Sequence, residues 1–235
     1  MLVLAGGFGT RLRNVVSDVP KPLAPVGTAP FLQYQVEHWV AQGVRSFVFL
    51  LHHQAEQIDQ FINERREDLF AGCVVESITE PQPLDTGGAV AYAVRHLGLE
   101  GEFLVTNADT WLGSGVRELD RIGADSMIVV TQADASRYGQ VQFDDAGFVR
   151  AFREKGDCAG AGWINAGMCA LRAEHFTAWA GQRLSLEKDV FPRLIMEHRL
   201  RAVLIEADFI DIGVPEDYQR YCRWRQRGRE GKLCS

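Results

Sequence analysis

Short apolar runs along this chain alternate with segments in which apolar residues recur three and four positions apart. Mostly apolar runs predict strands, at residues 2–5, 46–51, 73–78, 103–107 and 127–131. Helical spacing recurs between these runs, at residues 31–40, 54–66, 87–97 and 116–122. This alternation with short links predicts an α/β fold, in which a mostly parallel sheet carries helices on both faces.

The rhythm changes after residue 131. Residues 138–143 and 148–152 flank Asp144-Asp145-Ala146-Gly147, a polar turn that ends in glycine and indicates an inserted β-hairpin. Further strands are predicted at 163–171 and 200–205, and further helices at 186–196 and 215–225. No internal repeat, low-complexity tract or linker is present, so we expect residues 1–235 to form a single domain.

The clearest chemistry lies in the first strand and the loop that follows it. Leu4 and Ala5 end the strand, and Gly6, Gly7 and Gly9 come directly afterwards. Glycines leave backbone N–H groups accessible to an anion, because no Cβ stands in the way.

Two cations follow these glycines. Arg11, next to Thr10, offers a planar fork of donors that suits phosphate oxygens. Lys21 lies between Pro20 and Pro22, which restrict its backbone while its ammonium reaches out as a point charge. The strand, the glycine turn and the two cations together predict a cradle for a triphosphate.

Three alternative roles for the glycine loop fit the residues less well. The Walker pattern of P-loop proteins does not occur in the chain. The dinucleotide-binding pattern fails, because Leu12 stands where its third glycine is required. A plain strand-to-loop turn leaves the joint presence of Arg11 and the braced Lys21 unexplained.

The string from Leu4 to Leu12, followed by Pro20-Lys21-Pro22, resembles the signature of the sugar-1-phosphate nucleotidylyltransferases. The resemblance runs from Leu2 to about Tyr218 and implies a Rossmann-like fold of the nucleotide-diphospho-sugar transferase type. It implies that residues 1–131 bind the nucleotide, that residues 132–235 bind the sugar phosphate, and that the hairpin covers the site. The nucleotide-binding residues it implies here are Leu4, Ala5, Gly6, Gly7, Gly9, Thr10, Arg11 and Lys21.

Two aspartates are candidates for a metal site. Asp109 follows an apolar run, where a turn or helix-cap role is a common alternative. Asp211 lies in the aliphatic segment 209–213, where an unpaired carboxylate would be costly, so we expect a cation beside it. Two carboxylates with phosphate oxygens and waters suit Mg²⁺. The resemblance supports this assignment, although Ala108 stands where family members usually carry glycine.

A second loop opens a predicted helix with Thr86, Gly87 and Gly88. N–H groups at a helix start and the helix dipole favour a polar or anionic ligand, but a capped helix with a tight glycine contact fits equally well. In the family the corresponding loop reads the nucleobase and approaches the sugar. We therefore carry nucleotide binding over to these three residues.

The resemblance also implies which residues bind the sugar phosphate. Glu154 matches a glutamate that touches sugar hydroxyls, and Lys155 matches a lysine that holds the sugar phosphate, whereas a surface ion pair is the ordinary reading of this dipeptide. Asn165 and Gly167 match the family's Asn-x-Gly, in which the amide holds a sugar hydroxyl. The segment 187–189, Glu-Lys-Asp, is read as the solvated start of a helix, with the lining of the acceptor pocket as the lesser alternative.

Composition excludes several classes of protein. The 235 residues are 46% hydrophobic and 24% charged, which is ordinary for a globular protein, and the net charge of −6 disfavours a nucleic-acid partner. No apolar stretch approaches the roughly 20 residues of a membrane span. Five widely spaced cysteines without a C-x-x-C motif indicate free thiols, so with no signal peptide in view we expect a cytoplasmic location.

Within the family the chain looks most like guanylyltransferases that act on D-glycero-D-manno-heptose 1-phosphate, through Phe8, the 85–89 loop, the segment 154–156 and the segment 209–218. The resemblance implies that GTP and heptose 1-phosphate give GDP-heptose for a surface polysaccharide, with Arg11, Lys21 and Asp109 catalytic and Asp109 and Asp211 holding Mg²⁺. A mannose-directed guanylyltransferase, a uridylyl- or thymidylyltransferase and a non-catalytic sugar-nucleotide sensor remain alternatives. The oligomeric state is left open.

Overall fold

The computed structural model of the chain, called the structure below, describes residues 1–12, 14–153 and 160–228. The chain divides into two compact units, and each is described by itself. Unit 1 comprises Met1–Gln82, Asn107–Gly113 and Asp208–Ser235, and unit 2 comprises Pro83–Thr106 and Ser114–Ala207. The predicted division at residue 131 concerns which substrate each part of the sequence binds, and it stays a prediction.

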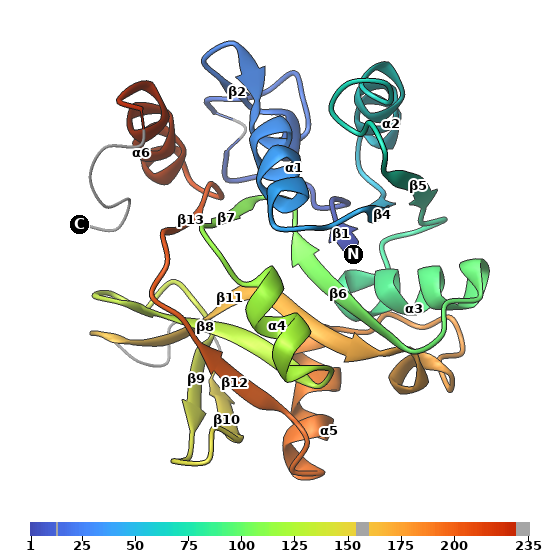
Figure 1. The fold of residues 1–235 in the computed structure, drawn as a ribbon, viewed down its shortest axis with the longest axis vertical. Helices are drawn as coiled ribbons and strands as arrows, with labels where there is room; N and C mark the ends of the chain where they lie inside the picture. Colours follow the sequence, from blue (N-terminus) through green and yellow to red (C-terminus); the bar gives the residue numbers. More distant parts are fainter. Residues whose placement is uncertain (13, 154–159, 229–235) are drawn as a thin grey trace. The chain divides into compact units, whose positions relative to one another are not determined.

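Unit 1 is built on three parallel strands in the order β1-β4-β5. The strands are β1 (Leu2–Leu4), β4 (Ser46–Leu51) and β5 (Val74–Thr79). Val3, Phe47 and Phe49 are fully buried, as the mostly apolar runs predicted. Three helices of predicted position accompany the strands, namely α1 (Phe31–Ala41), α2 (Ala55–Glu64) and α6 (Pro215–Gln226). In the view of Figure 1, α1 lies between α2 and α6.

Unit 1 also contains two short antiparallel ribbons that the sequence did not predict. One pairs β2 (Pro25–Val26) with β3 (Ala29–Pro30), and the other pairs β7 (Thr110–Leu112) with β13 (Phe209–Asp211). An aromatic cluster holds the second ribbon: the Trp111 ring centroid lies 5.6 Å from that of Tyr221 and 5.8 Å from that of Trp224 on α6. The closing helix therefore fixes the position of the ribbon in unit 1.

Unit 2 is centred on one long strand, β11 (Gly162–Arg172), which is antiparallel to three neighbours. Those neighbours are β6 (Glu102–Asn107, whose last residue belongs to unit 1), β8 (Ser126–Gln132) and β9 (Gln140–Phe143). Strand β12 (Arg201–Leu204) is parallel to β8. The predicted hairpin is confirmed, because β10 (Val149–Arg153) pairs with β9 in the antiparallel sense. The fold is thus α/β with a mixed sheet.

Three predicted helices of unit 2 are confirmed, with one local difference. They are α3 (Asp85–Leu97), α4 (Val116–Ile122) and α5 (Phe191–Met196), and a short 3-10 turn, η2 (Ala173–Phe176), follows β11. The predicted helix 186–196 begins as a π-helical turn, η3 (Leu186–Val190), before α5. Pro192 lacks a backbone N–H, so the helical hydrogen-bond ladder has to change at this point.

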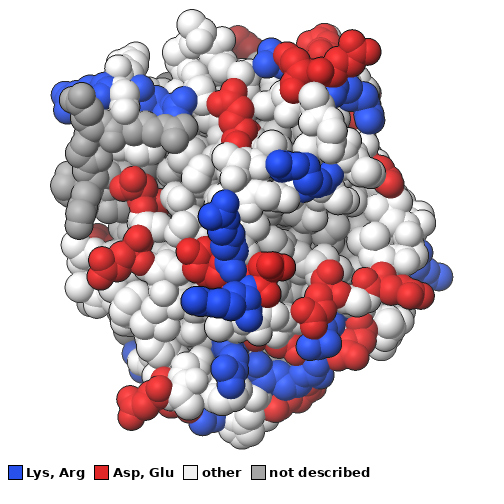
Figure 2. Space-filling model, viewed as in Figure 1, with Lys and Arg blue, Asp and Glu red and all other residues white. Residues whose placement is uncertain are grey.

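The surface carries charges of both signs. Figure 2 shows basic and acidic side chains interspersed over the face in view, without the broad basic field on which nucleic-acid binding relies. Among the helices of the described residues, none is long and apolar enough to cross a membrane.

Unit 2 contains an ionic cluster with a buried centre and two partly exposed arginines. Asp125 and His175 are buried, and the His175 Nε2 atom lies 2.5 Å from Asp125 Oδ1. The Arg199 Nε–H donates to the other carboxylate oxygen of Asp125 at 3.0 Å, and Arg172 approaches it at 3.7 Å. Removing one charge from a buried set lowers the free energy of unfolding, because the opposite charges stay buried without a partner.

We therefore expect Asp125→Asn to lower the free energy of unfolding by about 3 kcal/mol. Asparagine tolerates the left-handed backbone of this residue (φ +61°), so the substitution removes the charge rather than the turn. Urea denaturation followed by circular dichroism measures the loss, with Asp120→Asn on the exposed side of α4 as the matched control. Equal stability of the two variants would contradict the role of the cluster.

Candidate active site

The glycine loop leaves β1 at a point that neighbouring strands fix. The Ala5 N–H donates to the Leu50 carbonyl at 2.9 Å, and the Leu4 carbonyl accepts from the Ala108 N–H at 3.0 Å. These backbone groups are therefore hydrogen-bonded within unit 1. The loop begins at the carboxyl end of parallel strands, which is where open α/β sheets bind their ligands.

The three glycines of the loop meet different requirements. A Cβ placed on Gly6 would lie 3.0 Å from the His52 Cβ, so close packing requires glycine there. Gly9 has φ +59°, in the left-handed region that favours glycine. Gly7 has neither constraint, because a Cβ placed on it would meet no described atom within 4 Å. The face of the loop at Gly7 is open, as a phosphate cradle requires.

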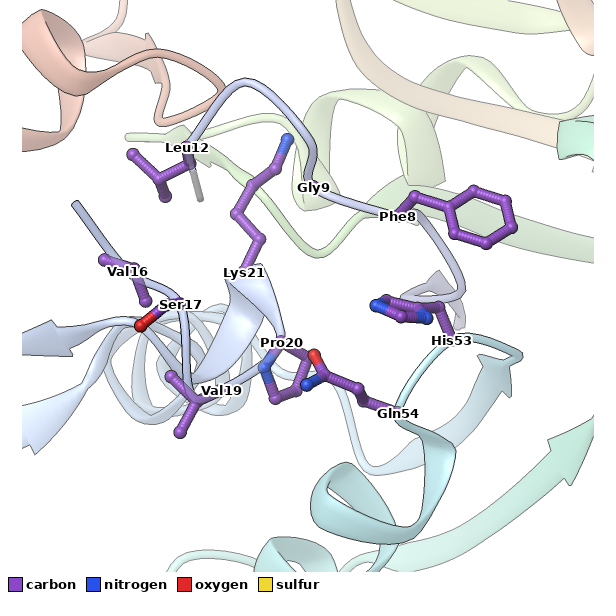
Figure 3. Close-up of a pocket in the computed structure, with 10 residues that line it drawn as sticks. All are labelled: Phe8, Gly9, Leu12, Val16, Ser17, Val19, Pro20, Lys21, His53 and Gln54. Atoms are coloured by element: carbon purple, nitrogen blue, oxygen red, sulfur yellow. The ribbon is translucent and has the colours of Figure 1, made fainter. Parts of the chain in front are cut away.

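Lys21 lies beneath this loop. It begins a short 3-10 turn, η1 (Lys21–Leu23), with Pro20 before it and Pro22 within it. Its side chain runs beside the loop, and its Cβ lies 3.5 Å from a Cβ placed on Gly9 (Figure 3). The Lys21 Nζ donates to Asp109 Oδ2 at 2.6 Å, and the two side chains are 13% and 32% exposed. A cation and a carboxylate therefore meet beside the open loop.

The β7–β13 ribbon brings the two predicted metal aspartates to neighbouring positions. Asp211 pairs with Thr110, the residue after Asp109, and the Ile212 N–H donates to the Asp109 carbonyl at 3.0 Å. The Gly213 N–H donates to Asp211 Oδ1 at 2.7 Å, and a Cβ on Gly213 would lie 2.7 Å from the same oxygen. Glycine is therefore required beside the Asp211 carboxylate.

The donor set at this ribbon fits a hard divalent cation. Mg²⁺ takes oxygen ligands and usually binds through one or two carboxylates together with substrate phosphates and waters. Asp109 and Asp211 supply carboxylates only, and no group of three or more His, Cys, Asp or Glu side chains that could hold a metal occurs in the described residues.

The other residues of the glycine loop present their side chains outward. Arg11 is exposed, and its guanidinium makes no hydrogen bond or ion pair within the described chain. Phe8 is 49% exposed, and its ring centroid lies 5.2 Å from that of His53. A cavity of about 190 Å³ lies between Phe8, Lys21, His53 and the residues around Val16 (Figure 3).

The sequence predicts that the histidines are surface groups or have their hydrogen bonds satisfied within the protein. The prediction missed His53, which lines this cavity. A signal is present in the chain: His52 and His53 follow the apolar strand 46–51 directly. The carboxyl end of a parallel strand is the position at which ligands are expected.

The second predicted nucleotide loop, in unit 2, is tightly bonded to the chain itself. The Thr86 hydroxyl donates to Glu187 Oε2 and accepts from the Leu186 N–H, both at 2.9 Å. The Gly88 N–H donates to the Leu184 carbonyl at 2.8 Å. These polar groups at the start of α3 are therefore engaged, and the contact of this loop with a nucleobase stays a prediction.

The prediction that residues 187–189 form a solvated helix start was wrong for Glu187, whereas Lys188 and Asp189 are exposed as predicted. Glu187 is half-buried, and its carboxylate accepts from Thr86 and from the Ser185 hydroxyl at 3.1 Å. Asp189 caps the turn by accepting from the Ser185 N–H at 2.7 Å. The physical reason is a partner 101 positions away in the sequence, which local patterning does not reveal.

The predicted sugar-phosphate residues are described only in part. Asn165 Oδ1 accepts from the Gly167 N–H at 3.0 Å, Gly167 has φ +73°, and the register of β11 shifts beyond Asn165. Glu154 and Lys155 lie outside the described residues. Asn165 and Gly167 are thus part of one bend in a long strand.

Residues 1–223 match the nucleotidyl transferase family. The chain belongs to this family. It is 32% identical to the D-glycero-alpha-D-manno-heptose 1-phosphate guanylyltransferase of Campylobacter jejuni, over 94% of this chain and 97% of that protein. It is 30% identical to the enzyme of the same name from Aneurinibacillus thermoaerophilus, over 93% and 95% of the two chains.

A third relative is longer. The chain is 31% identical to the mannose-1-phosphate guanylyltransferase catalytic subunit beta of Drosophila melanogaster, over 92% of this chain, but spans 60% of that protein. Among solved structures, HddC from Yersinia pseudotuberculosis has a TM-score of 0.83 and 32% identity, over 94% of this chain and 97% of that chain. A second structure of HddC, in complex with GMP-PN, has a TM-score of 0.80 and 31% identity, over 94% of this chain and 97% of that chain.

We predict that Gly7→Ala weakens nucleotide binding without lowering stability. The added methyl meets no described atom and no left-handed backbone, so the melting temperature should stay the same or rise slightly. The methyl occupies the open face of the loop, and we expect the KM for the nucleotide to rise about tenfold, the cost of one displaced hydrogen bond to a charged group.

Gly9→Ala provides the contrast, because alanine in the left-handed region costs about 1 kcal/mol or more of stability. Differential scanning fluorimetry and steady-state kinetics distinguish the two variants. An unchanged KM in folded Gly7→Ala would show that phosphates do not approach this face.

Proposed function

We propose that this nucleotidyltransferase transfers a guanylyl group from GTP to D-glycero-D-manno-heptose 1-phosphate, giving GDP-heptose and pyrophosphate. The observation that carries the reaction class is the contact of Lys21 with Asp109 beside an open glycine loop, with Asp211 at the neighbouring position of the β7–β13 ribbon. The choice of guanine and heptose is supported by two relatives that carry this activity in their names and match almost end to end.

This reaction needs no general base. A sugar 1-phosphate is mostly dianionic at neutral pH, since the second pKa of a phosphate monoester is about 6. The difficulty lies in bringing one phosphate anion to the α-phosphorus of another. Catalysis of such a transfer consists mainly of alignment and neutralisation of charge.

Each residue of the cluster has a distinct task in this proposal. Lys21, held rigidly by its prolines, exchanges its Asp109 contact for the α-phosphate and stabilises the charge that develops there. Arg11 and the glycine N–H groups hold the β- and γ-phosphates, which leave as pyrophosphate. Asp109 and Asp211 would hold Mg²⁺, which would supply Lewis-acid neutralisation of phosphate oxygens.

The sugar side of the site is assigned by resemblance. Asn165 uses its Oδ1 atom on Gly167, which leaves its amide nitrogen to donate to a sugar hydroxyl. Glu154 is assigned to the sugar hydroxyls and Lys155 to the sugar phosphate. We place the enzyme in the cytoplasm, where GTP is available, and its product in the synthesis of a surface polysaccharide.

A second candidate acceptor is mannose 1-phosphate, because the Drosophila relative is named for it. A panel of substrates decides between the candidates. We expect pyrophosphate release with GTP and heptose 1-phosphate that exceeds release with mannose 1-phosphate, with UTP, dTTP, CTP and ATP inactive or much slower. Chelation of the metal with EDTA should abolish release, and excess Mg²⁺ should restore it. Release with a different pair only would overturn the substrate assignment.

We expect Lys21→Ala and Asp109→Asn each to lower kcat by about 10²–10³, as typical for removing one charge-stabilising group. Neither change should prevent folding, because both side chains are partly exposed. The matched controls Arg117→Ala and Asp120→Asn remove an exposed charge of each sign on α4 and should keep wild-type kcat. Near wild-type turnover in folded Lys21→Ala would refute its role.

A further inference from the structure

In unit 2, two glycines at the start of α3 are closely packed, Gly87 by residues 184–186 and Gly88 by the residue before the helix. A Cβ placed on Gly87 would lie 3.1 Å from the Leu184 carbonyl oxygen and 3.2 Å from the Leu186 backbone nitrogen. A Cβ on Gly88 would lie 2.8 Å from the Leu84 Cβ. The glycines at this loop are thus demanded by packing within the chain, whether or not a ligand approaches them.

Hydrogen bonds link the same two segments. Besides the Gly88 bond, the Leu184 N–H donates to the Leu84 carbonyl at 3.0 Å. The Thr86 hydroxyl is used twice, as an acceptor for the Leu186 N–H and as a donor to Glu187 Oε2. A hydroxyl has one proton to donate, and Thr86 has committed it to Glu187.

Glu187 supplies a negative charge at the start of a helix. A half-buried carboxylate is favourable beside a helix N-terminus, because the helix dipole is positive there. Its charge also acts on β11, where burial and the nearby Glu187 carboxylate raise the pKa of the Cys169 thiol. The chain thus provides its own anion at the position where the sequence predicted a ligand for Thr86.

The loop that this contact holds is strained. Asp85, directly before Thr86, has φ +68°, a left-handed conformation that is unusual for a residue other than glycine. Arg183 approaches the Asp85 carboxylate at 3.5 Å. Backbone strain of this kind persists only where the surroundings enforce it, and residues 183–187 are those surroundings here.

We propose that Thr86 and Glu187 form a latch that positions the first turn of α3 (the loop 85–88 of the sequence prediction) for the nucleotide, without contacting the nucleotide through their side chains. The inference rests on the proposed function, and it assigns Thr86 and Glu187 as positioning residues. Opening the latch releases the strained backbone at Asp85, so the loop adopts its binding conformation less often. Apparent affinity for the nucleotide falls in proportion to that population, while the chemistry of bound substrates is unchanged.

Four single variants and one double variant test the latch. Thr86→Val removes the hydroxyl at nearly constant shape, and Glu187→Leu removes the acceptor. Thr86→Ser restores the hydroxyl and serves as the rescue. Glu206→Gln removes an exposed carboxylate elsewhere in unit 2 and serves as the matched control.

We expect Thr86→Val and Glu187→Leu each to raise the KM for GTP about tenfold, with kcat and the KM for the sugar 1-phosphate within about twofold of wild type. The double variant should be no worse than the poorer single variant, because both changes open one contact. Thr86→Ser and Glu206→Gln should behave as wild type. Buried residues such as Val90 keep α3 in place, so the variants should remain folded by circular dichroism.

Three results would overturn the latch. A rise in the KM for the sugar 1-phosphate in place of GTP would make Glu187 a sugar contact. Additive losses in the double variant would deny the coupling of the two residues. A lower melting temperature with an unchanged KM for GTP would leave a purely structural role.

The latch and the proposed function fail in different ways. Wild-type protein that turns over no nucleotide and sugar phosphate pair contradicts the proposed function. The latch is then judged on the dissociation constant of GTP by calorimetry, which the two single variants should raise about tenfold. If wild-type protein binds no GTP, both proposals are wrong.

Discussion

The ion pair between Lys21 and Asp109 is the contact on which the rest of the candidate site depends. A site for two phosphate anions must carry positive charge, yet the chain as a whole has a net charge of −6. Such a site therefore needs cations placed locally, and Lys21, held by its hydrogen bond to Asp109, is the cation that our proposal places there. Much of unit 1 can be understood as the support of this pair.

That support comes from segments far apart in the sequence. Pro20 and Pro22 restrict the backbone of Lys21 on one side of the pair. On the other side, the β7–β13 ribbon places Asp211 next to the turn that carries Asp109, and α6 covers the ribbon with aromatic side chains. A substitution at Trp111 or in α6 would therefore shift the two aspartates indirectly, through the ribbon that carries them.

Much of this arrangement could be predicted from the sequence, and the reasons for the remainder are physical. Strand β4 and helix α4 bury continuous or periodic apolar positions, so their patterns are strong. The strands β7 and β13 have three residues each, which is too short for any period to show. Glu187 was misread for a related reason, since its partner Thr86 is 101 positions away and only folding brings the two together.

The glycines illustrate the same distinction. The sequence shows where glycine is used but does not show why, and the structure separates the reasons: close packing at Gly6, backbone conformation at Gly9 and an open face at Gly7. Only the last of these leaves room for a ligand. In unit 2, Gly87 and Gly88 in the first turn of α3 are packed against the chain itself, so a glycine pair in the sequence is not by itself evidence of a phosphate site.

The central claim is that Lys21, Asp109 and Asp211 form one site for the reacting phosphates. A crystal structure with Mg²⁺ and a non-hydrolysable GTP analogue tests it most directly. The account predicts a metal ion bound by both aspartates, and Lys21 Nζ transferred from Asp109 to an oxygen of the α-phosphate. A nucleotide bound elsewhere, or a metal held by the phosphates while the Lys21–Asp109 pair stays closed, would contradict it.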